Sequence, residues 1–161
     1  GEAAKEHLPL VAADRIAGVE AFRAQGRTPM GSAFEMARLL LEDKEKVPAR
    51  SYRPVLILVS DGAPTDDWEE PLSVLKGSER AQKASRFAMA IGADADRAML
   101  GQFVNDRETP VFEADGARDI VKFFKAVTMS VVARSTSTSP DQALALDLGS
   151  DLSDDLDLDA L

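Results

Sequence analysis

An uninterrupted apolar run, Val55 to Val59, is followed directly by Ser-Asp-Gly at residues 60–62. A run of Val, Leu and Ile without a helical period is typical of a central strand in a parallel sheet, buried on both faces. The polar residues after the run then lie at the carboxyl edge of the sheet, where open α/β folds bind their ligands. Asp61 is therefore a candidate residue of a metal or phosphate site.

The composition is that of one globular domain with an acidic end. The chain has 161 residues, 45% of them hydrophobic, and its lack of cysteine excludes disulfides and thiolate metal sites. Residues 141–161 hold seven Asp and no Lys or Arg, and so carry most of the net charge of −9. The nearly neutral remainder has no basic footprint, so we expect no nucleic-acid partner. No stretch approaches the ~20 apolar residues of a membrane span, so we expect no membrane contact. The absence of cysteine fits a cytoplasmic protein.

Helical and strand patterns alternate along residues 14–132. Helices are predicted at about 14–24, 28–46, 69–84 with a break at Gly77, 94–103 and 115–132, and strands at 54–60, 87–91 and 110–113. This alternation predicts an α/β fold with an open, mainly parallel sheet flanked by helices. Residues 133–140 are expected to be a Ser/Thr linker, and residues 141–161 a disordered Asp/Leu-rich acidic tail.

Two short motifs together resemble the von Willebrand factor A (VWA) family. They are GRTPMG at residues 26–31 and SDGAPTDDW at residues 60–68. In order and spacing they are similar to the cytosolic bacterial TerY-like branch, which is associated with tellurium-resistance and stress operons. The resemblance covers about residues 1–132, and it implies a Rossmann-like VWA fold and a protein-binding module that is not an enzyme.

The VWA family carries a metal-ion-dependent adhesion site (MIDAS), usually for Mg²⁺ or Mn²⁺. The resemblance implies that Thr28 and Asp61 supply two of the pieces of this metal site. Hydroxyl and carboxylate oxygens are the hard ligands that Mg²⁺ prefers. A coordination position left open on the metal would then accept an acidic residue of a partner protein.

The remaining piece of the family's metal site, Asp-x-Ser-x-Ser after the first strand, has no match in the chain. Residues 1–10 are similar to the segment that follows the family's second strand. We therefore expect an N-terminally incomplete VWA fold in which the strand at 54–60 has an open edge. A second chain could supply the missing first strand. An apolar run in the tail ends at Asp147, but it lacks the Asp-x-Ser-x-Ser pattern.

Simpler interpretations of the two candidate ligands stay open. Thr28 could be only a helix N-cap, and Asp61 only part of an Asp-Gly turn. The domain would then be a metal-free structural or assembly unit. A Mg²⁺-dependent phosphohydrolase with Asp61 as the nucleophile is disfavoured, because such enzymes need a second acid at the position of Ala63.

The polar residues around the candidate site have predicted supporting roles. Ser60 is expected to support its loop by hydrogen bonding. Asp66 and Asp67 are expected to be loop or cap acids before a helix at Trp68. Asp94 is expected to cap the helix that follows it, as an acid that complements the helix dipole.

Overall fold

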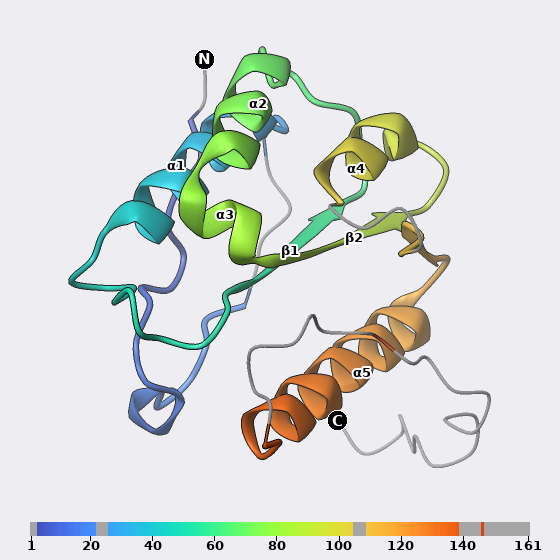
Figure 1. Cartoon of the computed structure of the whole chain (residues 1–161). Helices are drawn as coiled ribbons and strands as arrows, with labels where there is room; N and C mark the ends of the chain where they lie inside the picture. Colours follow the sequence, from blue (N-terminus) through green and yellow to red (C-terminus); the bar gives the residue numbers. More distant parts are fainter. Residues whose placement is uncertain (1–2, 22–25, 105–108, 139–145, 147–161) are drawn as a thin grey trace. The chain divides into compact units, whose positions relative to one another are not determined.

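The computed structural model describes residues 3–21, 26–104, 109–138 and 146. The chain divides into two compact units, residues 1–54 with 62–84 and residues 55–61 with 85–161. We call the first the helical unit and the second the sheet unit. Figure 1 labels the elements of both units, each of which is described by itself.

The helical unit contains helices η1 (Ala13–Arg15), α1 (Met30–Glu42), α2 (Glu69–Gly77) and α3 (Glu79–Lys83). Helix α1 packs against α2 and α3. Apolar side chains at helical spacing on α1 and α2 are buried in this unit: Phe34, Leu41, Leu72 and Leu75. The predicted break at Gly77 is confirmed, because the Ser78 side chain accepts a hydrogen bond from Ala81 N at 3.2 Å and thereby begins α3.

The prediction of a first helix at 14–24 is wrong over residues 14–21, the part that the structure describes. Only the short 3-10 helix η1 forms there, and residues 16–21 have no regular structure. Ile16 and Val19, whose spacing would place them on one face of such a helix, are exposed. A helix of this length is marginal in water unless an apolar face is buried. Here the apolar residues are not buried, so propensity alone does not stabilise a helix.

The sheet unit contains β1 (Val55–Ser60), β2 (Ser85–Ile91), α4 (Arg97–Phe103), β3 (Phe112–Ala114) and α5 (Ala117–Ser135). The strands form a three-stranded sheet in the order β1-β2-β3. Both strand pairs are parallel, with Val55 opposite Ser85 and Met89 opposite Phe112. The prediction of an α/β fold with an open parallel sheet flanked by helices is confirmed.

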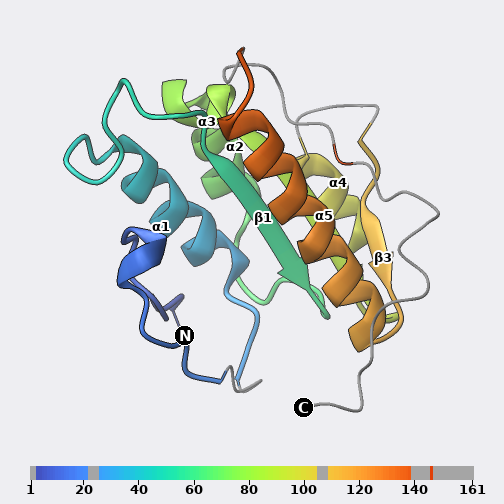
Figure 2. The ribbon, with the colours of Figure 1, turned by 90° about the horizontal axis from the view of Figure 1, so that it is seen from below.

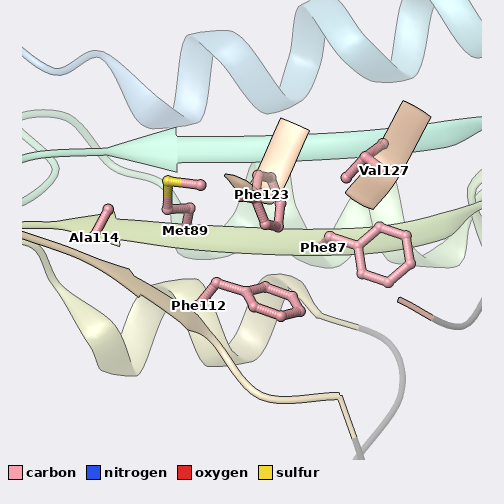
Figure 3. Close-up of a cluster of buried hydrophobic side chains, with 6 residues drawn as sticks. All are labelled: Phe87, Met89, Phe112, Ala114, Phe123 and Val127. Carbon is pink, nitrogen blue, oxygen red and sulfur yellow. The ribbon is translucent and has the colours of Figure 1, made fainter. Parts of the chain in front are cut away.

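Helices α4 and α5 cover opposite faces of this sheet (Figure 1). On the α5 side, alternate strand residues meet one face of the helix in the buried cluster of Figure 3: Phe87, Met89, Phe112, Ala114, Phe123 and Val127. The rings of Phe112 and Phe123 lie 4.9 Å apart between centroids. On the α4 side, the buried Arg86 donates from Nε to the Phe103 carbonyl oxygen at 2.8 Å, and burial lowers the pKa of its guanidinium.

The apolar run that predicted a central strand forms an edge strand in this sheet. Among the described residues β1 pairs with β2 only, which confirms the expected open edge. Most of its side chains are half-buried, and Val59 is 36% exposed. Complete burial on both faces needs a neighbour on each side, and β1 has one neighbour in the described part of the chain.

The last helix extends beyond its predicted end at 132, to Ser135, and so enters the expected linker. The expected disordered tail lies outside the described residues except for Leu146. That side chain is partly buried against the cluster on the α5 side. Among the described helices, none combines the length and the apolar character needed to cross a membrane.

Candidate functional site

Two loops of the helical unit meet at the start of α1. The Thr28 carbonyl oxygen accepts one hydrogen bond from Met30 N and another from Thr65 N, both at 2.9 Å. The side of Gly62 faces Thr28, because a Cβ placed on Gly62 would lie 3.7 Å from Thr28 Oγ1. The half-buried Thr28 is therefore held against the loop that follows β1.

Asp66 ties this loop to α1. Its Oδ1 accepts a hydrogen bond from Gly31 N at 2.9 Å, and its Oδ2 accepts one from Ser32 N at 3.0 Å. The residue at the N-cap position, Pro29, makes no side-chain cap hydrogen bond. Asp66 therefore satisfies the first amides of α1 from outside the helix and places a negative charge where the helix dipole favours one.

These contacts change two predictions. The helix begins at Met30 with Pro29 as its cap residue, so the interpretation of Thr28 as the N-cap is wrong. Asp66 is a cap acid, but of α1 and not of the helix that begins after Trp68. The role of Asp66 has no local signal in the sequence, because its hydrogen bonds join residues 35 and 34 positions apart.

Gly31 lets the two loops approach each other closely. A Cβ at this position would overlap the Asp67 carbonyl oxygen and lie 3.2 Å from the Trp68 Cα. Both neighbours are backbone atoms, which cannot move aside by a rotamer change. Close packing of the two loops therefore explains the glycine at the end of the GRTPMG motif.

The other candidate ligand, Asp61, ends the sheet unit's first segment directly after β1. Ser60 is buried, whereas Asp61 is exposed. Thr28 belongs to the helical unit, so the structure describes the two candidates in separate units. They are connected through the chain, because Asp61 is followed at once by Gly62, the residue that faces the Thr28 hydroxyl.

The donor chemistry of these two residues fits a small hard cation. A hydroxyl and an exposed carboxylate are oxygen ligands of the kind that Mg²⁺ and Mn²⁺ take, with waters completing the shell. The Asp66 carboxylate is engaged with α1 on both oxygens. Within the described ranges, no three His, Cys, Asp or Glu side chains cluster so as to hold a metal ion.

A family model for the von Willebrand factor type A domain matches residues 10–126. The chain belongs to the VWA family. Domains of this family commonly mediate protein–protein interactions and are mostly not enzymes. Comparison with curated proteins and with solved structures finds no significant match.

A second polar loop of the VWA domain lies after β2. Asp96 accepts a hydrogen bond from Met99 N at 3.0 Å and caps α4, so the cap is Asp96 and not the expected Asp94. Arg97 reaches back to the Gly92 carbonyl oxygen at 2.9 Å and pairs with Glu113 at 2.7 Å. The hydrogen bonds that Arg97 donates to the Glu113 carboxylate raise the pKa of the Arg97 guanidinium. This loop is therefore fixed at the carboxyl edge of β2 and β3.

Replacing Asp66 by alanine is expected to lower the free energy of unfolding by about 1–2 kcal/mol, because two helix amides lose their acceptors. Urea denaturation followed by the fluorescence of Trp68, the single tryptophan, measures the change. Asp66→Asn keeps one acceptor oxygen, so its free energy of unfolding should lie between those of the parent and Asp66→Ala. The matched control is Asp67→Ala, which removes a neighbouring exposed carboxylate and should change stability by less than about 0.5 kcal/mol. Equal losses in both variants would contradict the capping role.

Proposed function

We propose that this VWA domain is a metal-dependent protein-binding module in which Thr28 and Asp61 contribute ligands to Mg²⁺ or Mn²⁺. The observation that supports it best is the geometry around Thr28. The Asp66 link and the Thr28–Thr65 hydrogen bond hold the hydroxyl-bearing loop against Gly62, which is covalently attached to Asp61. When bound, the cation would supply a coordination position for a carboxylate from the partner.

The proposed partner is a protein that presents an acidic residue to the cation. We also propose that a second polypeptide supplies a strand to the open edge of β1. The proposed context is a cytoplasmic bacterial system of the TerY type, involved in stress or tellurium resistance. It rests on the resemblance of the two loop motifs, so it is an analogy at the level of the family branch. The proposed module is not an enzyme.

Calorimetric titration of the chain with Mg²⁺ and Mn²⁺ tests the metal half of the proposal. We expect binding in the parent and none in Asp61→Ala, because the exposed carboxylate supplies the only full negative charge among the two proposed ligands. The matched control is Asp94→Ala, which removes an exposed acid after the neighbouring strand and should leave the binding unchanged. Absence of binding in a folded parent, or its persistence in folded Asp61→Ala, would overturn the proposed site.

A metal-free assembly domain is the second candidate, and the open edge of β1 favours it. It predicts no cation binding, together with association through the sheet edge. The phosphohydrolase alternative predicts turnover of a phosphate ester that disappears in Asp61→Ala. Chromatography of the parent and a phosphatase assay on the titration samples separate these two outcomes from the proposed binding module.

A further inference from the structure

Helix α5 presents a regular row of side chains on the side that faces away from the sheet. The members of this row follow one another at alternating intervals of four and three residues, so they lie along one face of the helix. Figure 2 shows α5 from this side, with the sheet behind it. Lys122 is half-buried and the other members are exposed. We call the row the outer stripe of α5: Arg118, Lys122, Lys125, Met129 and Val132.

The two halves of the outer stripe differ in chemistry. The first half consists of three cations, and none of them forms an ion pair with another described residue. The single acid of α5, Asp119, accepts a hydrogen bond from Asp115 N at 3.1 Å. The second half consists of Met129 and Val132, which are 57% and 55% exposed. The stripe therefore has a basic end near the start of α5 and an apolar end near its last turn.

The C-terminal segment of the chain has the complementary pattern in the reverse order. Residues 143–148, ALALDL, are mainly apolar, whereas residues 151–159, DLSDDLDLD, hold five Asp and no Lys or Arg. A segment that follows α5 and runs antiparallel to it would meet the apolar end of the stripe first and the basic end second. Leucine would then lie against apolar side chains and aspartate against cations, which is electrostatic complementarity in one register.

Leu146 shows that the segment after α5 returns to the sheet unit. Its side chain is partly buried against the cluster to which α5 contributes Phe123 and Val127. Residues 147–161 could reach at most ~50 Å from this point if fully extended. The outer stripe, from Arg118 to Val132, is only ~20 Å long. Residues 147–161 are therefore long enough to cover the whole stripe.

The covalent connection favours the chain's own segment over an acidic segment of another molecule. Ion pairs on a protein surface are individually weak, so three of them give a free peptide little affinity. A segment on a short tether has an effective concentration of about 1 mM or more, far above that of a second copy in dilute solution. The same weak contacts can therefore hold a segment of the same chain and leave one of another chain unbound.

We propose that residues 147–161 dock on the outer stripe of α5 in the same molecule and shield it. Aspartates between 151 and 159 pair with the three cations, and leucines contact Met129 and Val132. Another acidic, leucine-rich segment can bind this face only when the chain's own segment is released. This inference goes beyond the proposed function and requires no metal ion.

Paramagnetic relaxation measured by NMR on the full chain tests the docking. The sequence contains no cysteine, so a nitroxide on Ser153→Cys labels a single site. We expect strong broadening of the amide signals of the outer stripe. The amides of α4 are the internal control, because α4 covers the opposite face of the sheet (Figure 1). A mixture of isotope-labelled parent with unlabelled, spin-labelled chain should show no such broadening, since the contact lies within one molecule.

Charge reversal on the stripe tests the ion pairs. Lys122→Glu combined with Lys125→Glu should lower the ratio of docked to free segment about tenfold, because two attractions become repulsions. The matched control is Lys44→Glu combined with Lys76→Glu, which changes two exposed lysines of the helical unit and should leave the broadening as it is in the parent.

A charge swap separates lost pairing from any other effect of these substitutions. Adding Asp154→Lys and Asp155→Lys to the doubly reversed stripe should restore the broadening, because opposite charges face each other again. Failure of this rescue in a folded protein, broadening of α5 no greater than that of α4, or broadening in the mixed sample alone would overturn the docking.

A fluorescent peptide of residues 147–161 tests the shielding. It should bind at least about tenfold more tightly to a chain whose aspartates at 147–159 are replaced by asparagine than to the parent, because the parent's own segment occupies the stripe. Equal binding of the peptide to the two proteins would overturn the shielding.

Discussion

Replacing Gly31 by alanine is expected to lower the free energy of unfolding by about 3 kcal/mol, at the upper end of the usual cost of overpacking. The added methyl group would overlap the Asp67 carbonyl oxygen and lie 3.0 Å from the carbonyl carbon. Both atoms belong to a backbone that Asp66 and Thr65 hold in place, so relief requires separation of the two loops. Urea denaturation followed by Trp68 fluorescence measures the loss.

The matched control is Gly77→Ala at the end of α2. A Cβ at Gly77 meets nothing within 4 Å, and its φ is not positive. Alanine should therefore be neutral, or stabilising by about 0.5–1 kcal/mol through the lower entropy of the unfolded chain. If Gly31→Ala lowers the free energy of unfolding no more than Gly77→Ala does, the two loops separate without penalty. The hydrogen bonds of Thr28 and Asp66 that join the loops would then be too weak to hold a site.

Phe123→Ala is expected to lower the free energy of unfolding by about 3–5 kcal/mol, because it removes a buried ring from the centre of the sheet unit's core. Phe123 is 2% exposed, and its ring contacts that of Phe112 across the interface between α5 and β3. The unit has a small core, so the remaining side chains have little scope to fill the space. Thermal and urea unfolding followed by far-ultraviolet circular dichroism report the loss.

Phe124→Ala provides the comparison on the same helix with the same change of side chain. Phe124 is 42% exposed, and its ring meets Phe123 edge-on at 5.4 Å between centroids. We expect a cost of about 1 kcal/mol or less. Similar losses in the two variants would mean that the cluster of Figure 3 is not the core of this unit.

The elements that the sequence predicts well are those whose signals are local. The apolar runs at β1 and β2, the break at Gly77 and the periodic positions of α5 each appear within a few residues of where the structure has them. The predicted helix at 14–24 fails in its described part because Ile16 and Val19 have a helical spacing but stay exposed. Periodicity predicts a helix only where tertiary structure buries the face that it creates.

The candidate site is predictable only in part for the same reason. Ser-Asp-Gly after an apolar run places Asp61 at a strand end without any knowledge of the fold. The burial of β1 depends on which strands flank it, so its edge position could not be read from its own residues. Asp66 is a further case, because a carboxylate that caps a helix from another loop looks like any loop acid in the sequence.

The two hydrogen bonds at the Thr28 carbonyl have a consequence for ion selectivity. A carbonyl oxygen has two lone pairs, and Met30 N and Thr65 N occupy both. A cation at this residue would therefore find the hydroxyl but not the backbone oxygen. Ca²⁺ gathers about 6–8 oxygens and commonly recruits carbonyls, whereas Mg²⁺ keeps several waters and needs few protein ligands. In the proposed site, the geometry at Thr28 would therefore favour Mg²⁺ over Ca²⁺.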